Sequence, residues 1–131
     1  MALIVLDATV LIGFLDADDA LHEASRGALS KHQRDELTTT ASVYAEIFVG
    51  PFRAGRGAVR RTDDFLAEWA IRIEPITAEI AKRAAALRVR RPAIRLPDAF
   101  VLALGDQISA DAILTGDAAW RGISRRVTVI A

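Results

Sequence analysis

Four acidic side chains in this sequence could together bind a divalent metal ion. Asp7 directly follows an apolar run, and Asp117 lies two residues beyond another. Asp98 stands in the first turn of an expected helix, and Glu46 lies in an otherwise apolar stretch. Converging carboxylates repel one another, and a divalent cation removes that repulsion. Because Mg²⁺ and Mn²⁺ prefer oxygen ligands, the four acids are candidate metal ligands and catalytic residues.

Each of these acids also has a structural explanation. Asp98 could complement the dipole of a helix N-terminus, and Asp117 could be an ordinary turn residue. Glu46 could be satisfied by a pairing arginine. Asp7 is the hardest to explain in this way, because a carboxylate at the end of a buried strand requires a partner or a cation.

Few side chains other than carboxylates are available to bind a metal. The sequence contains no cysteine, which excludes disulfides and thiolate metal sites. Its two histidines, His22 and His32, are expected to face solvent on a polar helix. A zinc hydrolase is therefore not favoured, and the expected cofactor is Mg²⁺, with Mn²⁺ as a substitute.

The elements that must position the acids alternate between strand and helix. Strands are predicted at residues 3–6, 37–40, 71–73, 112–115 and 127–130. Helices are predicted at residues 8–15, 20–31, 42–49, 58–70, 78–89 and 97–107. Ser42 is expected to cap the third helix, and Gly50-Pro51 is expected to end it.

This alternation predicts a three-layer α/β/α sandwich with a mainly parallel central sheet. Ligands of such sheets bind outside the carboxyl ends of the strands, and the four acids fall at or near those ends. Length and composition predict one domain, residues 1–131, because a chain of this size can bury a sizeable core. The apolar start reaches Asp7 without a basic leader, so we expect neither signal peptide nor membrane span, and a cytoplasmic protein.

Charge is balanced over the whole chain but not along it. Seventeen basic residues match seventeen acidic ones, whereas residues 51–95 contain eleven Lys or Arg and only five acids. Such a segregation suits a polyanion held by one surface and cations held by another. Solvated helix faces explain the same pattern equally well.

The order and spacing of the acidic motifs resemble the PIN domain, and more narrowly the VapC-type toxins of VapBC toxin–antitoxin pairs. The resemblance covers the whole chain and rests on Asp7-Ala8-Thr9, the helix carrying Glu46, Leu96-Pro97-Asp98-Ala99-Phe100 and Leu114-Thr115-Gly116-Asp117. It implies a Mg²⁺- or Mn²⁺-dependent endoribonuclease that hydrolyses RNA, such as tRNA or rRNA loops, and so inhibits translation.

The same resemblance implies partners and supporting residues. It implies a homodimer, a cognate VapB-type antitoxin, and a metal site in which the hydroxyls of Thr9 and Thr115 assist the four acids. Eight arginines become candidates for holding RNA phosphates, because guanidinium groups match phosphate oxygens. These are Arg53, Arg56, Arg60, Arg61, Arg88, Arg90, Arg91 and Arg95. Some of them could instead serve the dimer or antitoxin interface.

The aromatic residues and the type of domain each leave an alternative open. Tyr44, Phe48, Phe52, Phe65 and Trp69 either pack in the core or form an apolar groove for an antitoxin segment, and Trp120 either packs or flanks the site. A non-cleaving PIN-like module that binds RNA or protein also fits the sequence. A phospho-acceptor receiver domain fits less well, because residues 50–61 contain no acid and the only lysines are Lys31 and Lys82.

Overall fold

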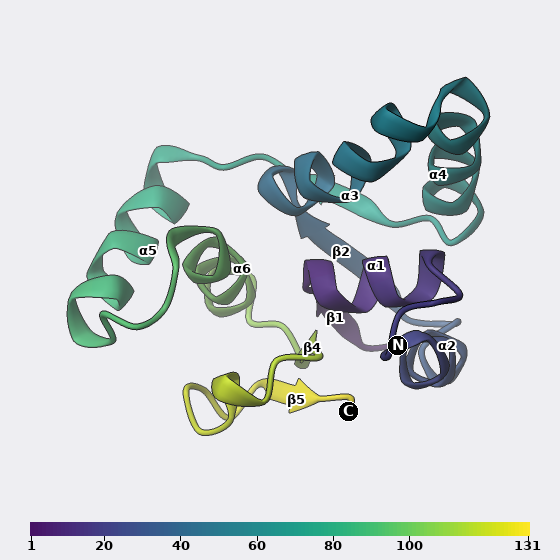
Figure 1. Cartoon of the computed structure of the whole chain (residues 1–131). Helices are drawn as coiled ribbons and strands as arrows, with labels where there is room; N and C mark the ends of the chain where they lie inside the picture. Colours follow the sequence, from purple (N-terminus) through teal and green to yellow (C-terminus); the bar gives the residue numbers. More distant parts are fainter.

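The computed structural model describes all residues, 1–131, and contains one sheet of five parallel strands between two layers of helices (Figure 1). The strands are β1 (Leu3–Leu6), β2 (Glu36–Thr40), β3 (Arg72–Glu74), β4 (Ala112–Thr115) and β5 (Val127–Val129). The helices are α1 (Ala8–Leu15), α2 (His22–Lys31), α3 (Ala41–Ala54), α4 (Arg56–Glu68), α5 (Ala78–Arg90) and α6 (Leu96–Gln107). The predicted α/β/α sandwich is therefore confirmed.

The strand order, β3-β2-β1-β4-β5, explains the two layers. Connections between parallel strands are right-handed. Helices that connect strands added toward one edge of the sheet therefore lie on one face, and helices that lead back toward the other edge lie on the opposite face. The helices α1 to α4 lie on one face, and α5 and α6, which lead back from β3 to β4, lie on the other (Figure 1). A receiver domain has the order 2-1-3-4-5 instead, so that alternative is wrong.

The central strand β1 is buried from both sides. Ile4, Val5 and Leu6 are almost fully covered, because β2 and β4 pair with β1 at its two edges and helices cover its two faces. The uninterrupted apolar run predicted this environment. The chain adds β2 and β3 on one side of β1, and β4 and β5 on the other side, so the strand order reverses between β1 and β4. The carboxyl ends of these two strands are therefore the expected binding crevice.

Two predicted helix boundaries are wrong for local reasons. The third helix, α3, continues through Pro51 and ends at Gly55, whose positive φ of 124° suits glycine and whose N–H donates to the Pro51 carbonyl. Packing of α3 along α4 outweighs the one backbone hydrogen bond that a proline removes. The cap of α3 is Thr40 rather than Ser42, because the Thr40 hydroxyl accepts from the Val43 N–H at 3.1 Å. None of the helices is long and apolar enough to cross a membrane.

Candidate active site

Asp7 lies at the carboxyl end of β1 and is held by two threonine hydroxyls. Its residue is only 4% exposed, and Thr9 and Thr115 both donate to Oδ2, at 2.8 and 2.9 Å. The Gly116 N–H in turn donates to the Thr9 hydroxyl at 2.8 Å, which fixes the orientation of that hydroxyl. Although Asp7 precedes α1, its side chain makes no capping hydrogen bond. The structure thus orients a buried carboxylate whose Oδ1 receives no hydrogen bond from the protein.

Glu46 projects from α3 and has no hydrogen-bond or ion-pair partner. Although much of its side chain is exposed, partial burial of the carboxyl raises its pKa above the ordinary value of 4.5. The negative charges of Asp7 and Asp98 raise this pKa further, and the positive charge of Arg95 opposes them. The alternative in which an arginine pairs directly with Glu46 is not seen.

Asp98 lies in the first turn of α6 with 16% of its side chain exposed. Burial raises its pKa above the ordinary value, the nearby Arg95 guanidinium lowers it, and the charges of Asp7 and Asp117 raise it again. The Arg95 Nε lies 3.4 Å from Asp98 Oδ2. Asp98 therefore does more than complement a helix dipole, since it also interacts with acids from two other elements.

Asp117 follows β4 and performs a local structural role beside the other acids. Its Oδ1 accepts the Ala119 N–H at 2.9 Å and so begins the short 3₁₀ turn Ala118–Trp120. The interpretation as a turn residue is correct, yet the charge of Asp117 still reaches Asp98. The residue is exposed and therefore free to interact with a ligand at the rim.

The four predicted acids come from four different elements and influence one another at one end of the sheet. Their oxygens suit a hard divalent cation, and such a cation would relieve the mutual repulsion that adds to burial in raising the pKa values of Glu46 and Asp98. In the conformation shown, however, no group of three or more His, Asp or Glu side chains is arranged to hold a metal ion. Protein donors engage Asp7, Asp98 and Asp117 individually.

Comparisons with known proteins identify the family to which this fold belongs. The sequence model of the PIN domain matches residues 4–125. The chain belongs to the PIN domain family. No curated protein matches this PIN domain in sequence.

Several solved structures share the fold. A toxin–antitoxin complex from Klebsiella pneumoniae is 22% identical, with 98% of each chain covered and a TM-score of 0.82. The sarcin–ricin loop cleaving toxin VapC20 from Mycobacterium tuberculosis is 21% identical, with 91% of this chain and 95% of the toxin covered and a TM-score of 0.73. FitAcB from Neisseria gonorrhoeae is 20% identical, with 98% of each chain covered and a TM-score of 0.75. At these identities the likeness establishes the fold.

The two histidines of this PIN domain do not join the acids. His22 Nδ1 lies 2.9 Å from the Gly13 carbonyl, and His32 Nδ1 lies 2.8 Å from Asp35 Oδ2. Both rings are partly buried, so the expectation that they face solvent is wrong. Each makes a local structural contact on α2 or at its end, and neither hydrogen-bonds an acid of the site.

The eight predicted RNA-binding arginines are all exposed. Four of them lie where α3 ends and α4 begins, and four lie between the end of α5 and the start of α6. Only one of the eight, Arg95, forms an ion pair with an acid. Arg88 donates to the Pro92 carbonyl at 3.1 Å, and the other six are free to meet an anionic ligand.

Both alternatives for the predicted aromatics are seen, because Phe48 and Phe65 are buried in the core and an apolar groove also exists, with a different composition. A groove of about 920 Å³ between α1, α3 and α4 is lined by Phe65, Trp69 and Phe14, with Glu46 also among its residues. The Phe14 ring stacks on Phe65 with centroids 4.8 Å apart, a contact that sequence reasoning missed although the apolar α1 helix signals it. The other three predicted aromatics form a separate row on α3, namely Tyr44, Phe48 and Phe52. Trp120 is 2% exposed and packs in the core.

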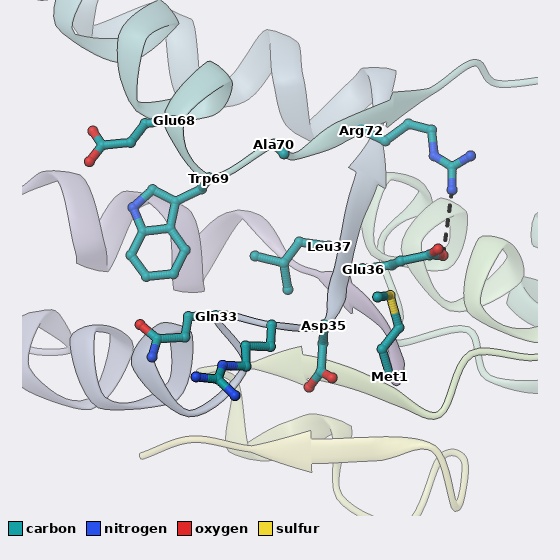
Figure 2. A pocket seen from close by; sticks show the side chains of 10 residues that line it. Met1, Gln33, Asp35, Glu36, Leu37, Glu68, Trp69, Ala70 and Arg72 are labelled. Carbon is teal, nitrogen blue, oxygen red and sulfur yellow. Dashed lines mark ion pairs between the residues drawn. The ribbon is translucent and has the colours of Figure 1, made fainter.

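A second cavity, of about 500 Å³, lies at the other end of β2 and contains none of the four acids. Figure 2 shows Glu36 and Arg72 on one side of it and Trp69 on the other. The Arg72 and Glu36 side chains form an ion pair at 3.8 Å. Because β2 begins at Glu36 and ends at Thr40, beside α3, this cavity opens away from the acidic end of the sheet.

Proposed function

We propose that this PIN domain is a Mg²⁺- or Mn²⁺-dependent endoribonuclease that acts as the toxin of a type II toxin–antitoxin pair. The observation that carries the proposal is the acidic cluster at the point where the strand order of the parallel sheet reverses. The cluster consists of Asp7, Glu46, Asp98 and Asp117. Two of these acids, Glu46 and Asp98, have raised pKa values, because their carboxyls are partly buried and because neighbouring negative charges add to that effect. Perturbed carboxylates that converge in a binding crevice are typical of functional sites.

In the proposed mechanism the four acids hold the metal and the chain's other groups orient them. A divalent ion bound there would lower the pKa of the attacking water and stabilise the negative charge on the departing oxygen. Thr9 and Thr115 hold Asp7 with its Oδ1 available as a ligand. Glu46, whose carboxylate makes no hydrogen bond within the protein, would be free to bind the metal and to accept a proton from water during phosphodiester hydrolysis.

The RNA and the cellular role are proposed from the structural relatives. VapC20 cleaves the sarcin–ricin loop, and the Klebsiella structure is a toxin–antitoxin complex. We therefore propose a structured RNA loop, of tRNA or rRNA, as substrate, inhibition of translation as the effect, and the cytoplasm as the place of action. Arg60 and Arg61 would contact RNA phosphates, so replacing both with Gln should weaken RNA binding and reduce its salt dependence. An unchanged salt dependence would argue against that contact.

The partners are proposed from the two apolar surfaces. The groove lined by Phe14, Phe65 and Trp69 suits an amphipathic antitoxin segment, and a segment lying there would cover Glu46. The row on α3 includes Phe52, which is 71% exposed, and suits the interface of a homodimer. The oligomeric state in solution, measured by light scattering for wild type and Phe52→Glu, tests the second assignment.

The decisive experiment is cleavage of total cellular RNA with Mg²⁺ or Mn²⁺. Wild type should cleave, whereas Asp7→Asn and Asp98→Asn should lose at least about a hundredfold in rate, as for other electrostatic catalytic groups. Asp63→Asn is the matched control, because Asp63 is exposed on α4 and forms no ion pair. RNA that is bound but left intact by wild type would favour the non-cleaving module instead. Equal cleavage by all variants would refute the acidic site.

A further inference from the structure

Arg95 differs from every other arginine that the sequence proposes for RNA. It is the N-cap residue of α6, three positions before Asp98, and its Nε lies 3.4 Å from Asp98 Oδ2. The remaining seven arginines, near the ends of α3 and α5 and in α4, form no ion pair with an acid. Arg95 is thus the one basic side chain that reaches into the acidic cluster.

The structure gives Asp98 no other partner. Asp7 receives two hydroxyl hydrogen bonds and Asp117 receives a backbone N–H, but Arg95 is the only group that hydrogen-bonds Asp98. In the conformation shown, a single guanidinium therefore balances the charge of Asp98.

A divalent cation and a guanidinium cannot both occupy the same carboxylate oxygen without repelling each other. We infer that Arg95 is a positioning residue. Its guanidinium acts as an internal counterion that holds the Asp98 carboxylate and competes with the divalent metal for that carboxylate. This inference rests on the proposed function, because it assumes that Asp98 is a metal ligand. In the conformation shown, Asp98 Oδ2 is directed toward Arg95.

The exposure of Arg95 makes the exchange feasible. Its side chain is 75% exposed, so the pair is weak and the guanidinium can leave Asp98 without becoming buried. Once displaced, it stays at the N-cap of α6 beside the cluster, where a phosphate of the substrate is a suitable new partner. Metal binding would therefore release an arginine for RNA at the edge of the site.

The competition predicts the direction of a change in metal affinity. Mn²⁺ is titrated calorimetrically into the full chain without RNA, at pH 8 and low salt, for wild type, Arg95→Gln, Arg95→Lys and Arg91→Gln. Arg95→Gln should bind Mn²⁺ about two- to fivefold more tightly, which is the effect of removing one exposed ion pair. Arg95→Lys keeps the charge and should remain near wild type. Arg91→Gln removes a neighbouring exposed arginine that has no acidic partner, and should bind Mn²⁺ as wild type does.

The outcomes separate this inference from the proposed function. Unchanged or weaker Mn²⁺ binding by Arg95→Gln, with wild type binding normally, would overturn only the role of Arg95. A similar gain in Arg91→Gln would also overturn it, because the effect would then be general to positive charge in this region. Failure of wild type to bind Mn²⁺ would refute the metal site itself, and this inference with it.

Discussion

Replacing Glu46 with glutamine removes one negative charge from the acidic cluster at almost constant side-chain volume. The Glu46 carboxyl makes no hydrogen bond, while burial and the charges of Asp7 and Asp98 raise its pKa. The ionised form therefore destabilises the fold. Because the Glu46 side chain is largely exposed, solvent screens this penalty, and in the absence of metal we expect Glu46→Gln to raise the free energy of unfolding by about 0.2–1 kcal/mol. The melting temperature should rise by roughly 1–4 °C.

The pH dependence follows from the sign of the pKa shift. Because the pKa of Glu46 is raised above its ordinary value of 4.5, the unfavourable charge is fully present above the raised pKa. The penalty disappears as the pH falls through that pKa and below 4.5, where Glu46 is protonated in both the folded and the unfolded chain. The advantage of Glu46→Gln should thus be largest near neutral pH and vanish in acid.

Thermal unfolding with EDTA, and again with saturating Mn²⁺, measures both sides of this prediction. At a metal concentration a hundred times its Kd, wild type should gain about 2.7 kcal/mol, whereas Glu46→Gln, which lacks one ligand, should gain clearly less. Glu68→Gln is the matched control, because Glu68 is an exposed glutamate that lines the same groove and forms no ion pair. It should change neither stability nor the gain from metal.

Two results would refute this reasoning. If Glu46→Gln were less stable than wild type in EDTA at neutral pH, the ionised carboxyl would not be a source of strain. If the variant and wild type gained equally from Mn²⁺, Glu46 would not be a metal ligand.

Three further substitutions test a hydrogen bond at the site and the packing of the core. Thr115→Val removes one hydrogen-bond donor to the buried Asp7 carboxylate. It should lower the free energy of unfolding, measured by urea denaturation, by about 1–3 kcal/mol, and it should also reduce nuclease activity. An unchanged free energy of unfolding would show that the hydroxyl is dispensable. Gly105→Ala places a Cβ against the Ile113 side chain in the core and should cost about 1–3 kcal/mol. By contrast, Gly27→Ala faces open space within a helix and should stabilise by about 0.5–1 kcal/mol, so equal effects of the two alanines would contradict the packing argument.

Sequence reasoning was most successful where one physical signal dominated. The continuous apolar run of β1 predicted a strand buried on both faces, and the structure confirms it. The helix from Ala8 to Leu15 and the strand from Ala112 to Thr115 have the predicted bounds. The end of α3 was predicted wrongly, because local proline and glycine signals were outweighed by packing against a helix that comes later in the chain.

The sequence by itself determined the alternation of strands and helices, the acidic residue types and their order, because periodicity and side-chain chemistry are local properties. Only the tertiary structure decided that α1 supplies Phe14 to the groove and that the row on α3 lies apart from it. It also decided that the two threonine hydroxyls converge on one oxygen of Asp7 and that Arg95 alone engages Asp98. These features depend on the strand order, which brings together side chains separated by about a hundred residues.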